Sequence, residues 1–124
     1  MIVVPMTVAL ITVAAGAVGA MIRYLVSRAV AGHDGFPWAV LVVNVVGSAI
    51  GGVVVGLATS GGVSSDIRLI LVSGLCGGLT TFSTWSVETI QLVQDGRWRI
   101  AAASVTANLV LGSGAAALGY LLAS

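Results

Sequence analysis

The amino-acid sequence predicts an all-α integral membrane protein with four transmembrane helices. Hydrophobic residues make up 58% of its 124 positions and charged residues only 7%, whereas a soluble domain has roughly 25% charged residues. The mean hydropathy is +1.13. Four uncharged stretches each reach or approach the ~20 residues that an α-helix needs to cross the hydrocarbon core. These stretches are residues 1–22, 35–65, 69–87 and 100–124.

We expect one transmembrane domain over residues 1–124, with helices at about 2–27, 38–59, 67–93 and 99–123. The first apolar stretch lacks the basic segment that precedes the apolar region of a signal peptide, so it is interpreted as a helix of the mature protein. Its Gly16 and Ala20 are four residues apart, a spacing that lets helices pack closely in lipid.

The five cationic residues are all arginines. Arg28, Arg97 and Arg99 fall in or beside the first and third loops, while Arg68 in the second loop is opposed by Asp66. Under the positive-inside rule the first and third loops would be cytoplasmic. This bias of three to one is small, so the sequence specifies the orientation only weakly.

Several polar residues near the apolar stretches have a structural interpretation. His33 lies beside Asp34 between glycines, which predicts a solvated turn, because a metal site needs several converging ligands. The single Cys76 is expected to be a small packing residue. Arg23, one residue past an apolar run, either reaches the lipid headgroups, attracts anions at a pore mouth or binds backbone carbonyls.

Two of the predicted helices, the second and the last, carry polar side chains within their apolar sequence. Asn44 is the one strongly polar residue of the second helix, and it precedes Ser48 by one turn. It is either a hydrogen-bonding contact between helices or a neutral N–H donor beside an anion path, since a neutral donor binds an anion without trapping it. Ser104 and Asn108 lie one turn apart on the last helix and would line the same path.

The third stretch is expected to be broken near residues 77–81. Residues 74–88 are rich in glycine and hydroxyl side chains, which disfavour a continuous helix. Irregular backbone at membrane depth is tolerated only inside the protein or beside a water-filled cavity, so the break predicts a polar ligand. Thr81, Trp85 and Glu88 are assigned to one helical face. Glu88 either reaches the interface or belongs to the polar site.

Three motifs together resemble the Fluc, or CrcB-type, fluoride channels. They are Gly-x-x-Gly-Ala-x-x-Arg-Tyr at residues 16–24, Val-Asn-x-x-Gly-Ser at 43–48 and Gly-x-x-Gly-Gly-x-Thr-Thr-Phe-Ser-Thr at 74–84. The resemblance covers three of the four helices in the right order. It implies a passive, fluoride-selective anion channel of the bacterial inner membrane. It also implies an antiparallel, dual-topology homodimer with two pores at the interface.

The resemblance further implies roles for individual residues. The backbone carbonyls of Gly77 and Thr80 from both chains would hold a central, structural Na⁺. The ring edges of Phe82 and Trp85 would face the anion. The other implied pore residues are Asn44, Ser83, Thr84, Ser104 and Asn108. Arg23 and Glu88 are candidate vestibule or gate residues.

The sequence departs from the family at two positions. Trp85 stands where the family more usually has phenylalanine, and its indole either donates its N–H to fluoride or narrows the pore. Asn108, in the implied polar stripe of the last helix, would take the place of a hydroxyl residue of the family.

Two other functions remain as alternatives. A small four-helix proton-coupled exporter would need an acidic residue in its first helix, and this first helix has none. A non-transporting membrane assembly subunit would need only the glycine-rich interfaces. Neither accounts for the Gly-Gly-x-Thr-Thr segment followed by aromatic and hydroxyl residues. No catalytic triad, metal cluster or phosphate loop indicates an enzyme, and nothing indicates nucleic-acid binding.

Overall fold

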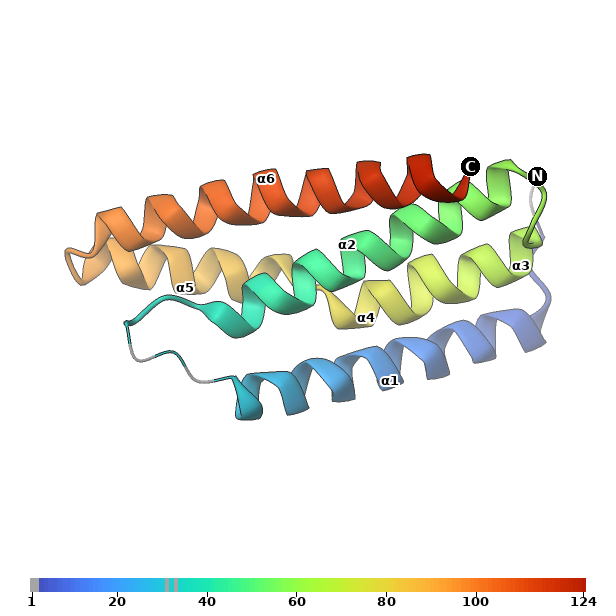
Figure 1. The fold of residues 1–124 in the computed structure, drawn as a ribbon. Coiled ribbons are helices and arrows are strands. Elements are labelled where there is room, and N and C mark those ends of the chain that lie inside the picture. Colours follow the sequence, from blue (N-terminus) through green and yellow to red (C-terminus); the bar gives the residue numbers. More distant parts are fainter. Residues whose placement is uncertain (1–2, 31, 33) are drawn as a thin grey trace.

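The computed structural model describes residues 3–30, 32 and 34–124. Its regular elements are all helical, and four helical spans are long and apolar enough to cross a membrane, as the sequence predicted. The spans lie side by side in an elongated bundle (Figure 1). The first, second and fourth spans are α1 (Met6–Ala29), α2 (Trp38–Thr59) and α6 (Trp98–Ala123). The turn predicted at His33 lies outside the described residues.

The third span, Ser65–Gln94, consists of four consecutive elements. They are α3 (Ser65–Arg68), the π-helical η1 (Leu69–Cys76), α4 (Gly77–Leu79) and α5 (Phe82–Gln94). In η1 the backbone hydrogen bonds close over five residues, as in the bond from the Gly77 N–H to the Val72 carbonyl. Such wide turns are rare and are frequently found at functional sites.

Glycines in the left-handed region end two of the spans. Gly61 (φ 84°) follows α2, and Gly96 (φ 75°) follows α5. In each case the next residue donates its N–H back to the last helical turn, from Gly62 to Leu57 at 2.7 Å and from Arg97 to Leu92 at 2.8 Å. This C-terminal hydrogen bonding satisfies helix-end carbonyls and requires a residue that tolerates positive φ.

Backbone contacts between small residues hold α2 against α6. A Cβ atom at Gly52 would overlap the backbone carbonyl of Ala116, and one at Gly119 would lie 2.8 Å from the Ala49 carbonyl oxygen. The hydrophobic effect does not drive helices together in lipid, so this close approach provides the packing energy instead.

The same kind of contact attaches α1 to the third span. A Cβ atom at Gly78 would overlap the backbone of Gly16, and one at Gly19 would lie 2.7 Å from the Leu79 nitrogen. Gly19 is the one buried residue of α1, and the rest of the helix is partly or fully exposed. The attachment of α1 therefore depends on a narrow strip of small residues.

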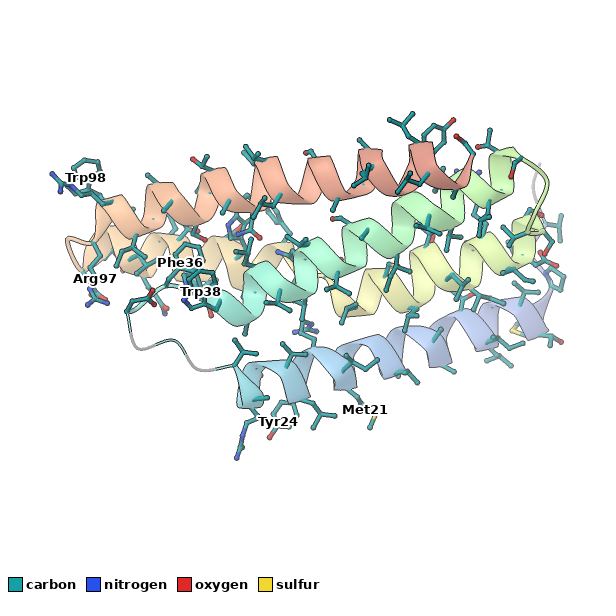
Figure 2. All side chains as sticks on the ribbon, in the orientation of Figure 1. Met21, Tyr24, Phe36, Trp38, Arg97 and Trp98 are labelled. Carbon is teal, nitrogen blue, oxygen red and sulfur yellow. The ribbon has the colours of Figure 1, made fainter. Side chains whose placement is uncertain are left out.

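The side chains of Phe36, Trp38, Arg97 and Trp98 lie at one end of the bundle (Figure 2). The rings of Phe36 and Trp38 are tilted by 46° with centroids 4.6 Å apart, and the Arg99 guanidinium lies 5.5 Å from the Trp98 ring centroid. Amphipathic rings of this kind favour the headgroup region of a bilayer. This end is therefore expected at the membrane–water interface.

We predict that Gly78→Ala destabilises the bundle, because the new methyl group forces α1 away from α4. Overpacking of this kind costs about 1–3 kcal/mol. The melting temperature of the purified protein in detergent should fall by several degrees. Gly114→Ala is the matched control, since a Cβ atom at Gly114 meets nothing within 4 Å. Equal melting temperatures for the two variants would contradict the proposed dependence on close backbone contact.

Candidate functional site

The third span is interrupted at two threonines. Thr80 (φ −80°, ψ 157°) and Thr81 (φ −146°, ψ 117°) are extended, and the helix resumes at Phe82. Gly77 and Gly78 remain helical. The interruption therefore lies at the C-terminal edge of the range expected from the sequence, and Gly78 serves close packing instead of breaking the helix.

The side-chain amide of Asn44 on α2 pairs with the backbone of Thr81. Its Oδ1 accepts from the Thr81 N–H at 2.8 Å, and its Nδ2 donates to the Thr81 carbonyl at 3.3 Å. The Thr81 N–H can only donate, so the orientation of the amide is determined. An unpaired backbone group costs several kcal/mol in lipid, and this pair removes two such costs at the break.

A hydrogen-bonded chain extends from the break to α6. Asn44 Nδ2 also donates to Asn108 Oδ1 at 3.0 Å, and Asn108 Nδ2 donates to the Ser104 carbonyl at 2.8 Å. Both N–H groups of Asn44 thus donate to other residues of the same protein, Thr81 and Asn108. The sequence left Asn44 as either a contact between helices or a donor beside an anion path. The structure shows the contact between helices. A fluoride ion bound by Asn44 would have to replace one of these partners.

Thr81 caps α5, a role that the sequence interpretation missed. Its Oγ1 accepts from the Thr84 N–H at 3.1 Å and donates to Thr84 Oγ1 at 3.0 Å. The assignment of Thr81 to the helical face of Trp85 and Glu88 was wrong, because Thr81 is extended and precedes α5. The preference of threonine for the N-cap position was the signal that could have identified this role.

Four of the predicted pore residues line one pocket of about 250 Å³: Asn44, Phe82, Trp85 and Asn108. The rings of Phe82 and Trp85 are edge to face, with centroids 5.8 Å apart and an interplanar angle of 72°. Thr81 also lines the pocket. Amides, an extended backbone and aromatic rings thus meet at the middle of the third span.

The other predicted pore residues lie outside this pocket. Ser83 and Thr84 line a separate pocket of about 370 Å³ with Glu88. Ser104 is fully buried, one turn along α6 from Asn108. Three buried polar atoms have no hydrogen-bond partner in the described part of the chain: Trp85 Nε1, Glu88 Oε2 and Ser104 Oγ.

Arg23 contacts the backbone at the end of α4. Its Nε donates to the Gly78 carbonyl at 3.2 Å, so of the three interpretations of Arg23 the structure shows binding to a backbone carbonyl. Arg23 and Glu88 line one pocket of about 180 Å³. The guanidinium therefore satisfies one of the carbonyls that the break leaves without a helical partner.

The carbonyls of Gly77 and Thr80 accept no hydrogen bond from the described residues. The Thr81 N–H, which would bond Gly77 in a continuous helix, donates to Asn44 instead. Both residues line a groove of about 590 Å³ between α2, η1 and α6. Unpaired carbonyl oxygens are hard ligands, so this donor set fits a cation such as Na⁺.

The chain matches the family described as CrcB-like protein, Camphor Resistance (CrcB), over residues 10–120. It is 43% identical over 121 residues to the fluoride-specific ion channel FluC 1 of Frankia casuarinae, covering 92% of this chain and 94% of the relative. A second relative is the fluoride-specific ion channel FluC of Pyrococcus abyssi, with 39% identity over 115 residues and the same coverage.

The fluoride-specific ion channel FluC of Gluconobacter oxydans is 40% identical over 122 residues, covering 94% of this chain and 85% of the relative. The family match and these relatives agree with the resemblance carried by the sequence motifs and with the four helical spans. This chain is a multi-pass membrane protein that belongs to the CrcB family.

Proposed function

We propose that this chain is a passive, fluoride-selective anion channel that exports cytoplasmic fluoride. The observation that carries this proposal is the pocket at the break, where Asn44, Thr81, Phe82 and Trp85 meet in the middle of a membrane span. Similarity to channels named for fluoride along most of the chain supports the choice of anion. Helical spans fit the inner membrane of a bacterium, since outer-membrane proteins of this size are typically β-barrels.

The groups at the pocket suit a small, strongly hydrated anion. Fluoride must exchange water for several weak donors, and the positive edges of aromatic rings are such donors. The hydroxyls of Ser83 and Thr84 would continue the path, because these residues line the neighbouring pocket. Asn44 holds the extended backbone in place beside the rings. Neutral groups of this kind allow the anion to enter and to leave.

We propose that the functional unit is an antiparallel homodimer. The groove between α2, η1 and α6 is lined by small residues, among them Gly51 and Gly77. Small residues allow close approach of another backbone. A Cβ atom at Gly51 meets none of the described residues within 4 Å. No contact in the described part of the chain therefore requires a glycine at this position, whereas a second chain in the groove would.

Gly77 and Thr80, whose carbonyls are unpaired among the described residues, line the same groove. One chain supplies two such oxygens, and a second chain related by a twofold axis would supply two more around a structural Na⁺. When bound, the ion would neutralise partial negative charge between the chains. Arg23 and Glu88 would serve at the vestibule, since they line the pocket of about 180 Å³ beside the break.

Two alternatives fit the structure less well. A proton-coupled exporter needs a carboxylate in the first span, and α1 has none. A non-transporting subunit would not need the pairing of Asn44 with the interrupted backbone, because a continuous helix satisfies its own backbone groups.

Purified protein in liposomes should release fluoride without a proton gradient, and chloride should remain trapped. An ion-selective electrode for each anion measures the two effluxes, and protein-free liposomes are the control. Comparable rates for the two anions, or fluoride release that depends on a proton gradient, would exclude a fluoride-selective passive channel.

We predict that Asn44→Asp lowers fluoride efflux at least about tenfold, because it disturbs the backbone at the break, and each ~1.4 kcal/mol added to the barrier for anion passage is a factor of ten in rate. A carboxylate still accepts from the Thr81 N–H, but it cannot donate to the Thr81 carbonyl or to Asn108. It also places a negative charge beside the anion path. Gln94→Glu makes the same amide-to-acid change at an exposed position and should retain efflux. Full activity of Asn44→Asp would refute this role of the amide.

We predict that Gly51→Leu prevents dimerisation while each chain still folds, since the new side chain enters the groove and not the interior of its own chain. Native mass spectrometry should show a wild-type dimer that retains one Na⁺ and a Gly51→Leu monomer without it. Gly114→Leu, at another open glycine, should remain dimeric. A Gly51→Leu dimer that keeps its Na⁺ would show that this groove is not the interface.

A further inference from the structure

Three of the five arginines flank one end of the bundle, and all three are exposed. Arg28 is in the last turn of α1, and Arg97 and Arg99 lie at the start of α6. The two places adjoin each other, because a Cβ atom at Gly35, in the connection from α1 to α2, would overlap the Arg97 guanidinium. Arg97 and Trp98 mark this end in Figure 2. We call Arg28, Arg97 and Arg99 the arginine surface.

Aromatic rings support two of these guanidiniums. The Arg28 guanidinium lies 6.0 Å from the Tyr24 ring centroid, and its Nη1 also donates to the Tyr24 hydroxyl at 3.3 Å. The Arg99 guanidinium lies 5.5 Å from the centroid of Trp98, which is 62% exposed. A guanidinium over a ring face keeps its in-plane N–H donors for oxygen acceptors, and the fork of these donors matches a phosphate.

The carboxylates at this end are fewer than the arginines. Asp34 accepts from the Trp38 indole N–H at 3.2 Å, so one of its oxygens faces its own loop. Asp95 follows α5 and is exposed. Three cationic side chains thus stand against two carboxylates, whereas Arg68 at the other end is matched by Asp66. The arginine surface therefore carries an excess of positive charge.

The arginine surface lies where the phosphates of a bilayer are found. α1 ends at Ala29 and α6 begins at Trp98, so the three arginines are at the ends of apolar spans. Basic residues beside a span attract anionic lipids, and exposed tryptophan favours the same depth. None of the three arginines lines the groove proposed for a second chain. Dimerisation through that groove therefore does not require their burial.

We propose that the arginine surface binds the phosphate of an anionic phospholipid, with phosphatidylglycerol as the test ligand. The guanidinium N–H groups donate to the phosphate oxygens, and the exposed Trp98 ring lies among the headgroups. A zwitterionic lipid has the same phosphate but carries a cation beside it, which the arginines repel. This surface should therefore select lipids of net negative charge. The inference does not depend on which ion the chain conducts.

Native mass spectrometry of the purified protein in detergent measures the lipid that remains bound. With equal amounts of phosphatidylglycerol and phosphatidylethanolamine, the protein should retain mainly phosphatidylglycerol. Each arginine should contribute roughly fivefold to this affinity, so the double variant Arg97→Gln, Arg99→Gln should bind phosphatidylglycerol about 25-fold more weakly. Equal retention of the two lipids, or an unchanged affinity in the double variant, would overturn the proposal.

Matched variants separate charge from folding. Arg68→Gln removes the same charge at the other end and should leave the affinity unchanged. Arg97→Lys with Arg99→Lys keeps the charge and should keep most of the affinity, and a loss as large as that of the glutamine pair would contradict an electrostatic contact. Arg28→Gln, which should weaken binding roughly fivefold, tests the surface if Arg97→Gln disturbs the fold. Melting temperatures without lipid identify such a disturbance.

Inorganic phosphate distinguishes a lipid headgroup from free phosphate. Sodium phosphate at the concentration of the lipid should leave phosphatidylglycerol bound, because the apolar chains of the lipid hold its headgroup at the surface. Displacement of the lipid would indicate a site for free phosphate and overturn the assignment. None of these measurements uses fluoride, so loss of fluoride efflux would contradict the proposed function without affecting this result.

Discussion

The pairing of the Asn44 amide with the Thr81 backbone is the interaction on which the rest of the site depends. An extended segment in the middle of a membrane span leaves amides and carbonyls that water cannot reach. Asn44 takes up one of each, and Thr81 uses its hydroxyl to start α5. The position of Phe82 and Trp85 follows from where α5 starts. The ring pair is thus held in place by a side chain on another helix.

The bundle around this site is stabilised mainly by backbone proximity. Gly52 meets Ala116 between α2 and α6, and Gly78 meets Gly16 between α1 and α4. Contacts of this kind tolerate little change in side-chain size, because backbone atoms cannot move aside as a flexible side chain can. The contact of Gly52 with Ala116 fixes the distance between α2 and α6, and this distance lets Asn44 reach Asn108.

The sequence predicted the four spans and the neighbourhood of the break, because apolar length and the scarcity of charge leave few alternatives in a membrane. It could not distinguish a glycine that interrupts a helix from a glycine that lets two helices pack closely. Gly78 was included in the break, yet it is helical and serves packing. Thr81 was missed because helical periodicity was assumed to continue through the interruption. The contact between Asn44 and Asn108 depends on how α2 and α6 cross, which a single sequence does not reveal.

The interruption at Thr80 and Thr81 also divides the helix dipole of the third span into two shorter dipoles. A continuous helix has one positive end and one negative end, both at the membrane surfaces. The break places a negative helix end at Leu79 and a positive helix start at Phe82 within a few residues of each other. Arg23 covers part of the negative end through the Gly78 carbonyl. The positive start of α5 adjoins the aromatic pocket, so two threonines give the membrane interior adjacent sites that favour ions of opposite sign.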